Sequence, residues 1–187
     1  MEKLDLSLWG PLAKMIGTWE GSVGDDTAPG DDRGVEKNKF RELFVFTPFG
    51  PANNHEQTLY GLNYTRTAWR LGEDAPFHEQ IGYWLWDANA QQIIHSFMIP
   101  RGMTVLAGGQ ASAKSQTIKL TATLGSSTFG IASNPFLDKE FKTVKYDSTH
   151  TFIDASTFSY EENTQIQIKG QSQIFNHIDK NTLKKTR

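Results

Sequence analysis

Residues 15–24 read MIGTWEGSVG, and this stretch decides the fold. A glycine within a strand marks a sharp bend or a close crossing of a neighbouring backbone, where a Cβ atom would not fit. Gly17 and Gly21 flank Trp19 in this way, so the stretch predicts the entry strand of a small β-barrel. A barrel closed by its first and last strands has an interior. The final segment, FNHIDKNTL at residues 175–183, places His177 on that last strand.

Strand patterns dominate the rest of the chain. Alternating polar and apolar runs separated by Gly, Pro, Asn and Asp clusters are typical of antiparallel strands. Nine further strands are predicted at residues 40–47, 56–69, 77–86, 92–99, 103–109, 117–123, 140–153, 158–169 and 171–185. The fold class is therefore all-β, an antiparallel barrel or sandwich of about ten strands in a single domain over residues 1–187.

The connections are predicted from the same signals. Residues 24–34 are rich in Asp, Gly and Pro and predict a loop, and residues 125–138 predict a long connection. Residues 179–182 (DKNT) have the composition of a turn. Apolar residues at helical spacing predict one short helix over residues 4–15, limited by Pro11 and suited to cover a barrel end.

Composition narrows the function. The 187 residues include 12 Phe and five Trp, which suit the core of a β-protein, and the net charge of −2 argues against nucleic acid or anionic membranes as partners. Cysteine is absent, so disulfides, thiolate metal sites and a cysteine nucleophile are excluded. With no secretory signal pattern and no apolar run of about 20 residues, we expect a cytoplasmic protein.

Several motifs carry a family resemblance. The GTWEG of residues 17–21 resembles the Gly-x-Trp-x-Gly-x-Gly signature of the nitrobindin family, which is fatty-acid-binding-protein-like and includes the haem-binding C-terminal domain of a THAP-domain protein. The last signature glycine is replaced by Val23, with Gly24 one place later. PFHEQIGY at 76–83 resembles the family's His-Glu-x-Gly-aromatic strand, and NHEQTLYG at 54–61 and DKNTL at 179–183 resemble a bacterial branch.

The resemblance implies a fold, a cofactor and an activity. It implies a ten-stranded barrel related to lipocalins that binds haem b without covalent attachment. The axial ligand of the iron is a histidine of the last strand, and the matching residue here is His177. Ferric members of the family isomerise peroxynitrite to nitrate, so an enzymatic role depends on haem.

Two of the histidines are candidate site residues, and two others are predicted to be exposed. His177 is either the axial haem ligand or a histidine hydrogen-bonded at the rim, with Asp179 as a partner. His95 lies in an apolar strand and is either a distal polar group facing the cofactor or a buried core residue. His55 and His150 follow polar stretches and are predicted to be exposed. No His-x-His or His-Glu-x-x-His spacing supports a metal site built from protein ligands alone.

Other polar residues are assigned by strand alternation. His78 and Glu79 are adjacent, so one faces inward and the other outward. An arginine inside the barrel could bind a carboxylate with two hydrogen bonds. Arg41, Arg66 and Arg101 are nevertheless predicted to be solvated, Arg101 at a turn.

Three functions remain open on the sequence. The first is a haem-b barrel that handles nitric oxide or peroxynitrite. The second is a non-enzymatic carrier of a fatty acid or another small hydrophobic ligand, and the third is a barrel filled by its own side chains. The width of the interior beside His177 discriminates between them. A homodimer is also left open.

Overall fold

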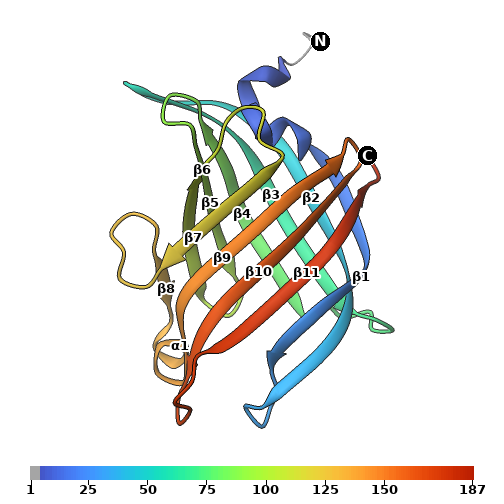
Figure 1. Cartoon of the computed structure of the whole chain (residues 1–187), viewed down its shortest axis with the longest axis vertical. Coiled ribbons are helices and arrows are strands. Elements are labelled where there is room, and N and C mark those ends of the chain that lie inside the picture. Colours follow the sequence, from blue (N-terminus) through green and yellow to red (C-terminus); the bar gives the residue numbers. More distant parts are fainter. Residues whose placement is uncertain (1–4) are drawn as a thin grey trace.

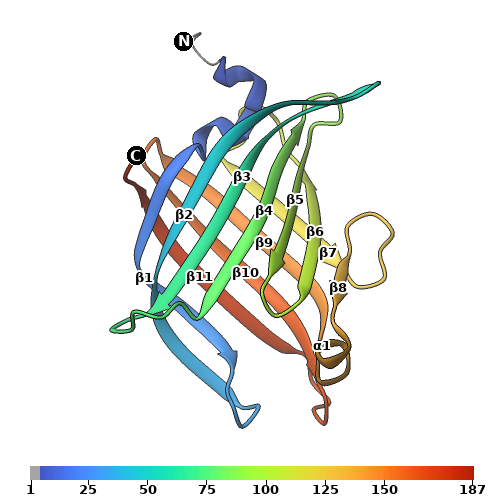
Figure 2. The same cartoon turned by 180° about the vertical axis from the view of Figure 1, so that it is seen from behind.

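A computed structural model describes residues 5–187 and shows eleven strands in this part of the chain (Figures 1 and 2). The strands are β1 (Gly17–Pro29), β2 (Val35–Asn54), β3 (Gln57–Arg70), β4 (His78–Asp87), β5 (Gln92–Ile99), β6 (Met103–Gln110), β7 (Thr117–Thr123), β8 (Ile131–Ser133), β9 (Phe141–Asp154), β10 (Thr157–Ile168) and β11 (Phe175–Lys185). The helices are η1 (Leu6–Lys14) and α1 (Pro135–Glu140).

Ten of these strands form a closed antiparallel ring. β1 pairs with both β2 and β11, and the ring continues through β10, β9, β7, β6, β5, β4 and β3. The seam between β6 and β7 is the single residue pair Gly108 and Thr121. The eleventh strand, β8, pairs with β6 outside this ring. It lies within the predicted 125–138 connection, as does the first part of α1. The predicted ten-stranded barrel is confirmed.

The entry strand contains a β-bulge. Gly21 pairs with Glu42 and Gly24 with Phe40, so β1 uses three steps where β2 uses two. The extra residue shifts the inward position from 23 to 24. A Cβ atom on Gly24 would lie 2.5 Å from the Phe40 ring, so glycine is needed there. The bulge explains why the signature glycine stands one place later than in the family pattern.

Two expected connections are part of strands. β1 and β2 extend to Pro29 and Val35, so only residues 30–34 turn, and the predicted 24–34 loop was wrong. The 179–182 turn was also wrong, because β11 runs unbroken through it and pairs with β10. The cause is common to both: these strands carry polar side chains on their inner face as well as the outer one, which removes the usual alternation.

The helix η1 covers one end of the barrel (Figure 1). Its buried side chains include Trp9 and Leu12, and Met15 follows at its C-terminal cap. The Trp9 indole N–H donates to the carbonyl of Gly61 over 2.9 Å. The short helix predicted for residues 4–15 is confirmed for the described residues, as a 3-10 helix kinked at Gly10; residue 4 lies outside them. Among residues 5–187, no helix has the length and apolar character of a membrane span.

Candidate functional site

A buried polar layer crosses the middle of the barrel and is centred on Arg66 of β3. Its side chain is 1% exposed. Nε donates to Glu42 over 2.8 Å, Nη1 donates to Glu162 over 2.8 Å and Nη2 donates to the Tyr160 hydroxyl over 2.5 Å. Strands β2, β3 and β10 are therefore joined across the interior, and every nitrogen of the guanidinium has a partner.

The acids of this layer outnumber its cation. Glu42 also accepts from Tyr160 and from the Asn181 amide over 2.9 Å, and Glu162 accepts from the Tyr146 hydroxyl over 2.9 Å. Burial raises the pKa of Glu42, although Arg66 and the hydrogen bonds oppose this. One guanidinium thus serves two carboxylates that water cannot reach.

β11 begins at the end of the barrel opposite η1 (Figure 1), and His177 lies near the start of this strand. Its side chain is 26% exposed and shares the inner face with Asp179 and Asn181, because residues two apart on a strand point the same way. The ring Nε2 lies 3.0 Å from Oδ1 of Asp26, on the adjacent strand β1, and 3.8 Å from Oδ2 of Asp179. The rim alternative named Asp179 as the hydrogen-bond partner, whereas the structure places Asp26 at hydrogen-bond distance and Asp179 farther away.

The two carboxylates set the charge of this histidine. Burial opposes protonation of His177, but Asp179 and Asp26 outweigh it and raise its pKa. Asp179 is itself buried, which raises its pKa against the opposing effects of His177 and Arg66. The side chain of Asp26 is only 2% exposed. The end of the barrel opposite η1, called the mouth below, therefore presents an imidazole next to two largely buried carboxylates.

The structure does not bring His95 into this cluster. Its ring is 1% exposed and stacks on Trp84, with ring centroids 4.0 Å apart. His150 is equally buried, with its ring 4.9 Å from Trp84. No described residue forms a hydrogen bond with either nitrogen of these two rings. Burial lowers the pKa of His95 well below its usual value and that of His150 to about 4, so both are neutral at pH 7.

Other polar residues can now be compared with the sequence expectations. The exposed position predicted for His150 was wrong, because a polar flanking sequence hid an inward strand position. The solvated position predicted for Arg66 was wrong as well, since buried acids on β2 and β10 compensate its charge. His55 is exposed and Arg101 lies at a turn, as predicted. His78 is half-buried and Glu79 exposed, which confirms their opposite orientation.

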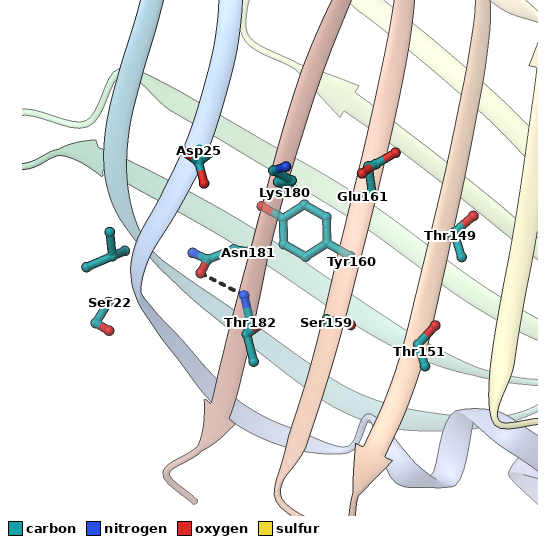
Figure 3. Close-up of a pocket in the computed structure, with 11 residues that line it drawn as sticks. Ser22, Asp25, Thr149, Thr151, Ser159, Tyr160, Glu161, Lys180, Asn181 and Thr182 are labelled. Atoms are coloured by element: carbon teal, nitrogen blue, oxygen red, sulfur yellow. Dashed lines mark hydrogen bonds between the residues drawn. The ribbon is translucent and has the colours of Figure 1, made fainter.

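A hollow lies on the outside of the barrel wall, where the β1 bulge separates β1 from β11 (Figure 3). Its volume is about 710 Å³. Lys180, Glu161 and Thr149 line its outer part, and Tyr160 and Asn181 form its floor. Because this lining is polar and lies on the outer surface, the hollow does not have the apolar, enclosing character of a macrocycle site.

Sequence analysis missed three residues that define the interior: Asp26, Glu42 and Glu162. Glu42 and Glu162 each lie within a predicted strand, and a fixed alternation would have placed both on the inner face. Asp26 had no such signal, because it was assigned to a loop and follows the bulge that changes the register of β1.

Fold and site together define a class of protein: an antiparallel barrel capped by a helix at one end, with an inward-facing histidine of the last strand at the other. The chain belongs to the family of THAP4-like, heme-binding beta-barrel domains, which matches residues 9–185. The nitrobindin resemblance and its haem cofactor are thereby supported at the level of the family.

Individual relatives agree with this assignment. The chain is 36% identical over 76 residues to a peroxynitrite isomerase of Clavibacter michiganensis subsp. michiganensis, a match that covers 40% of this chain and 33% of that protein. The crystal structure of Rv2717c from M. tuberculosis is similar with a TM-score of 0.71 and 22% identity, covering 99% of this chain and 100% of the other. At that identity the likeness shows the fold.

One side chain at the mouth has the chemistry of a haem ligand. An imidazole is the usual proximal ligand of haem iron, and His177 presents one near the start of β11. His78 is half-buried, and its shielded Nε2 has no described partner. The polar layer around Arg66 reaches the mouth, because Nη2 of Arg66 lies 3.8 Å from Oδ1 of Asp179. One contact must change, because Nε2 of His177 is held by Asp26 and iron would take the same atom.

Proposed function

We propose that this protein binds haem b at the mouth of its barrel, with His177 as the axial ligand, and isomerises peroxynitrite to nitrate. The single observation that carries the proposal is the inward, half-buried position of His177 on the last strand of a barrel in a haem-binding family. The activity is supported by the partial match to a peroxynitrite isomerase.

Different residues of this chain would bind the iron and keep the cofactor in place. His177 would hold the iron through Nε2 once Asp26 releases that atom. The bound haem would supply a ferric centre with an open position for a small anion. The polar layer around Arg66 would keep the cofactor at the mouth, because the charged side chains of this layer are already paired across the interior.

An interior arginine free to bind a fatty-acid carboxylate would support the carrier alternative. Arg66 is interior, but Glu42, Glu162 and Tyr160 occupy all of its nitrogens. Displacing them would leave two carboxylates without their cation, which costs more than one ligand carboxylate would return.

Haemin titration tests the proposal. The purified protein is expected to give a saturable, histidine-type Soret band, and His55→Ala should behave identically because His55 is exposed. The haem-loaded protein should then accelerate peroxynitrite decay to nitrate over the haem-free protein in stopped flow. A spectrum identical to free haemin would refute haem binding, and a loaded protein without acceleration would refute the isomerase activity.

Two further expectations stay predictions. The cytoplasmic location is an expectation from the sequence alone. A homodimer is supported by the outer face of β4 and β5, where Ile81 is 60% exposed and lies opposite Met98, which is 51% exposed. Sedimentation velocity of the wild type and of Ile81→Lys tests it, with a shift from dimer to monomer as the expected result.

A further inference from the structure

Asp26, His177 and Asp179 form a second kind of site at the same mouth. Each residue offers one ligand atom, and the three atoms lie within 4.8 Å of one another. They come from two adjacent strands, β1 and β11, which pair directly at Asp26 and Asp179. The cluster is therefore fixed by main-chain hydrogen bonds and does not depend on a loop.

The spacing suits a small divalent ion. Two ligand atoms bound to Zn²⁺ at about 2.0–2.2 Å and at a tetrahedral angle lie roughly 3.3–3.6 Å apart. Nε2 of His177 lies 3.0 Å from the Asp26 oxygen and 3.8 Å from the Asp179 oxygen, values on either side of that range. Small side-chain movements would bring both oxygens to bonding distance.

The surrounding charge favours a cation. The inner layer and the mouth hold four carboxylates, those of Glu42, Glu162, Asp179 and Asp26, and all four have side chains at most 16% exposed. Arg66 is the guanidinium that faces them, at 3.8 Å from Asp179. Four carboxyl groups therefore face one guanidinium, and protonation of His177 adds only one further positive charge. A divalent ion would add two.

The ligand types select the class of ion. One imidazole nitrogen with two carboxylate oxygens suits Zn²⁺, Co²⁺ or Mn²⁺, whereas Ca²⁺ and Mg²⁺ prefer oxygen alone. Three protein ligands leave a fourth position open. We infer that Asp26, His177 and Asp179 bind a non-haem divalent transition-metal ion, and that this ion and haem exclude each other because both need Nε2 of His177.

Co²⁺ is the direct probe, because a site with nitrogen and carboxylate ligands gives visible absorption bands. The tag-free protein is titrated with Co²⁺, and Zn²⁺ binding is measured by calorimetry. Asp26→Asn, Asp179→Asn and His177→Ala are each expected to weaken binding at least tenfold, while Asp31→Asn, in an exposed turn, should leave it unchanged. Circular dichroism confirms that each variant is folded.

Asp26→Asn separates this inference from the haem proposal. It removes a cation ligand but frees Nε2 for iron, so it should bind Co²⁺ at least tenfold more weakly and haemin at least as tightly as the wild type. Saturating Zn²⁺ should in turn raise the apparent haemin dissociation constant of the wild type. Cation binding without haem binding would refute the haem proposal alone.

Two results would overturn the inference. The first is no Co²⁺ or Zn²⁺ binding by the folded wild type, which would leave the three residues as an ion pair only. The second is binding that persists unchanged in His177→Ala, which would place the ion elsewhere.

Discussion

The helix-capped end of the barrel is filled with apolar side chains, whereas the middle layer and the opposite mouth are held by charges. At the capped end, Trp9, Leu12 and Trp19 are each at most 3% exposed and pack into one continuous core. Toward the mouth, Arg66 and His177 are fixed by carboxylates from neighbouring strands. The same closed ring of strands therefore supports two kinds of interior.

The difference teaches where a ligand can enter. Apolar packing is dense and non-directional. Opening it loses the free energy gained by burying every side chain involved. A charged pair at the mouth can be exchanged for another partner of suitable charge and geometry. The capped end contributes dense apolar packing, and the mouth offers a contact at His177 that another partner could replace.

The largest expected effect tests the charged layer. Arg66→Met should destabilise the protein by about 3–5 kcal/mol, because it leaves Glu42 and Glu162 buried without their cation. Urea denaturation followed by tryptophan fluorescence measures the change. Arg101→Met, at an exposed turn, is the control and should change stability by less than about 0.5 kcal/mol. Equal losses in the two variants would show that the layer is not a structural unit.

The next effect separates the two groups of histidines by pH. Burial lowers the pKa of His150 to about 4 in the folded protein. As the pH falls, His150 is therefore protonated in the unfolded chain before it is protonated in the folded one, and the free energy of unfolding decreases between pH 6.5 and 4. By pH 4.5 this loss should reach about 2–3 kcal/mol. His150→Phe should remove that part of the acid destabilisation, measured as the difference in unfolding free energy between pH 7 and pH 4.5. An unchanged pH dependence in the variant would contradict a neutral, buried His150.

His177 should show the opposite sign. Its folded pKa is raised, so its contribution to stability is complete below pH 6.5 and is lost as the pH rises through the folded value. The stability difference between wild type and His177→Asn should therefore be larger at pH 6 than at pH 9. A difference that grows with pH would show that the carboxylates of Asp26 and Asp179 do not hold the protonated ring.

The smallest effect concerns the bulge beside the mouth. Gly24→Ala places a Cβ atom 2.5 Å from the Phe40 ring and should cost about 1–3 kcal/mol by overpacking. Ser22→Ala, at an exposed position of the same bulge, should be nearly neutral. Thermal unfolding measures both variants. A neutral Gly24→Ala would mean that the wall near the mouth is loosely packed.

The barrel could be predicted from the sequence because the patterns that indicate its strands are local. Alternation, turn residues and the glycines around Trp19 each report on a few neighbouring residues, and they gave the ten-strand ring and the covering helix. The failures share one cause. Residues 24–34 and 179–182 carry polar side chains on the inner face, which local rules assign to loops and turns.

Of the three residues clustered at the mouth, the sequence indicated only His177 as a candidate ligand, from its position near the C-terminus and the family resemblance. Its role as a haem ligand stays a prediction, while the structure shows its contact with Asp26. The partnership with Asp26 could not be predicted, because the two residues are 151 positions apart and meet only when the ring closes. Arg66 was missed for a similar reason: its buried charge depends on Glu162, 96 positions later.

The most direct measurement compares the two histidines predicted to bind the cofactor. His177→Ala and His95→Phe are titrated with haemin beside the wild type, and the Soret band is recorded. His95 lies packed against Trp84, so His95→Phe should keep a saturable, histidine-type spectrum, while His177→Ala should lose it. The contrary result, a spectrum lost in His95→Phe and kept in His177→Ala, would contradict a haem site at the mouth.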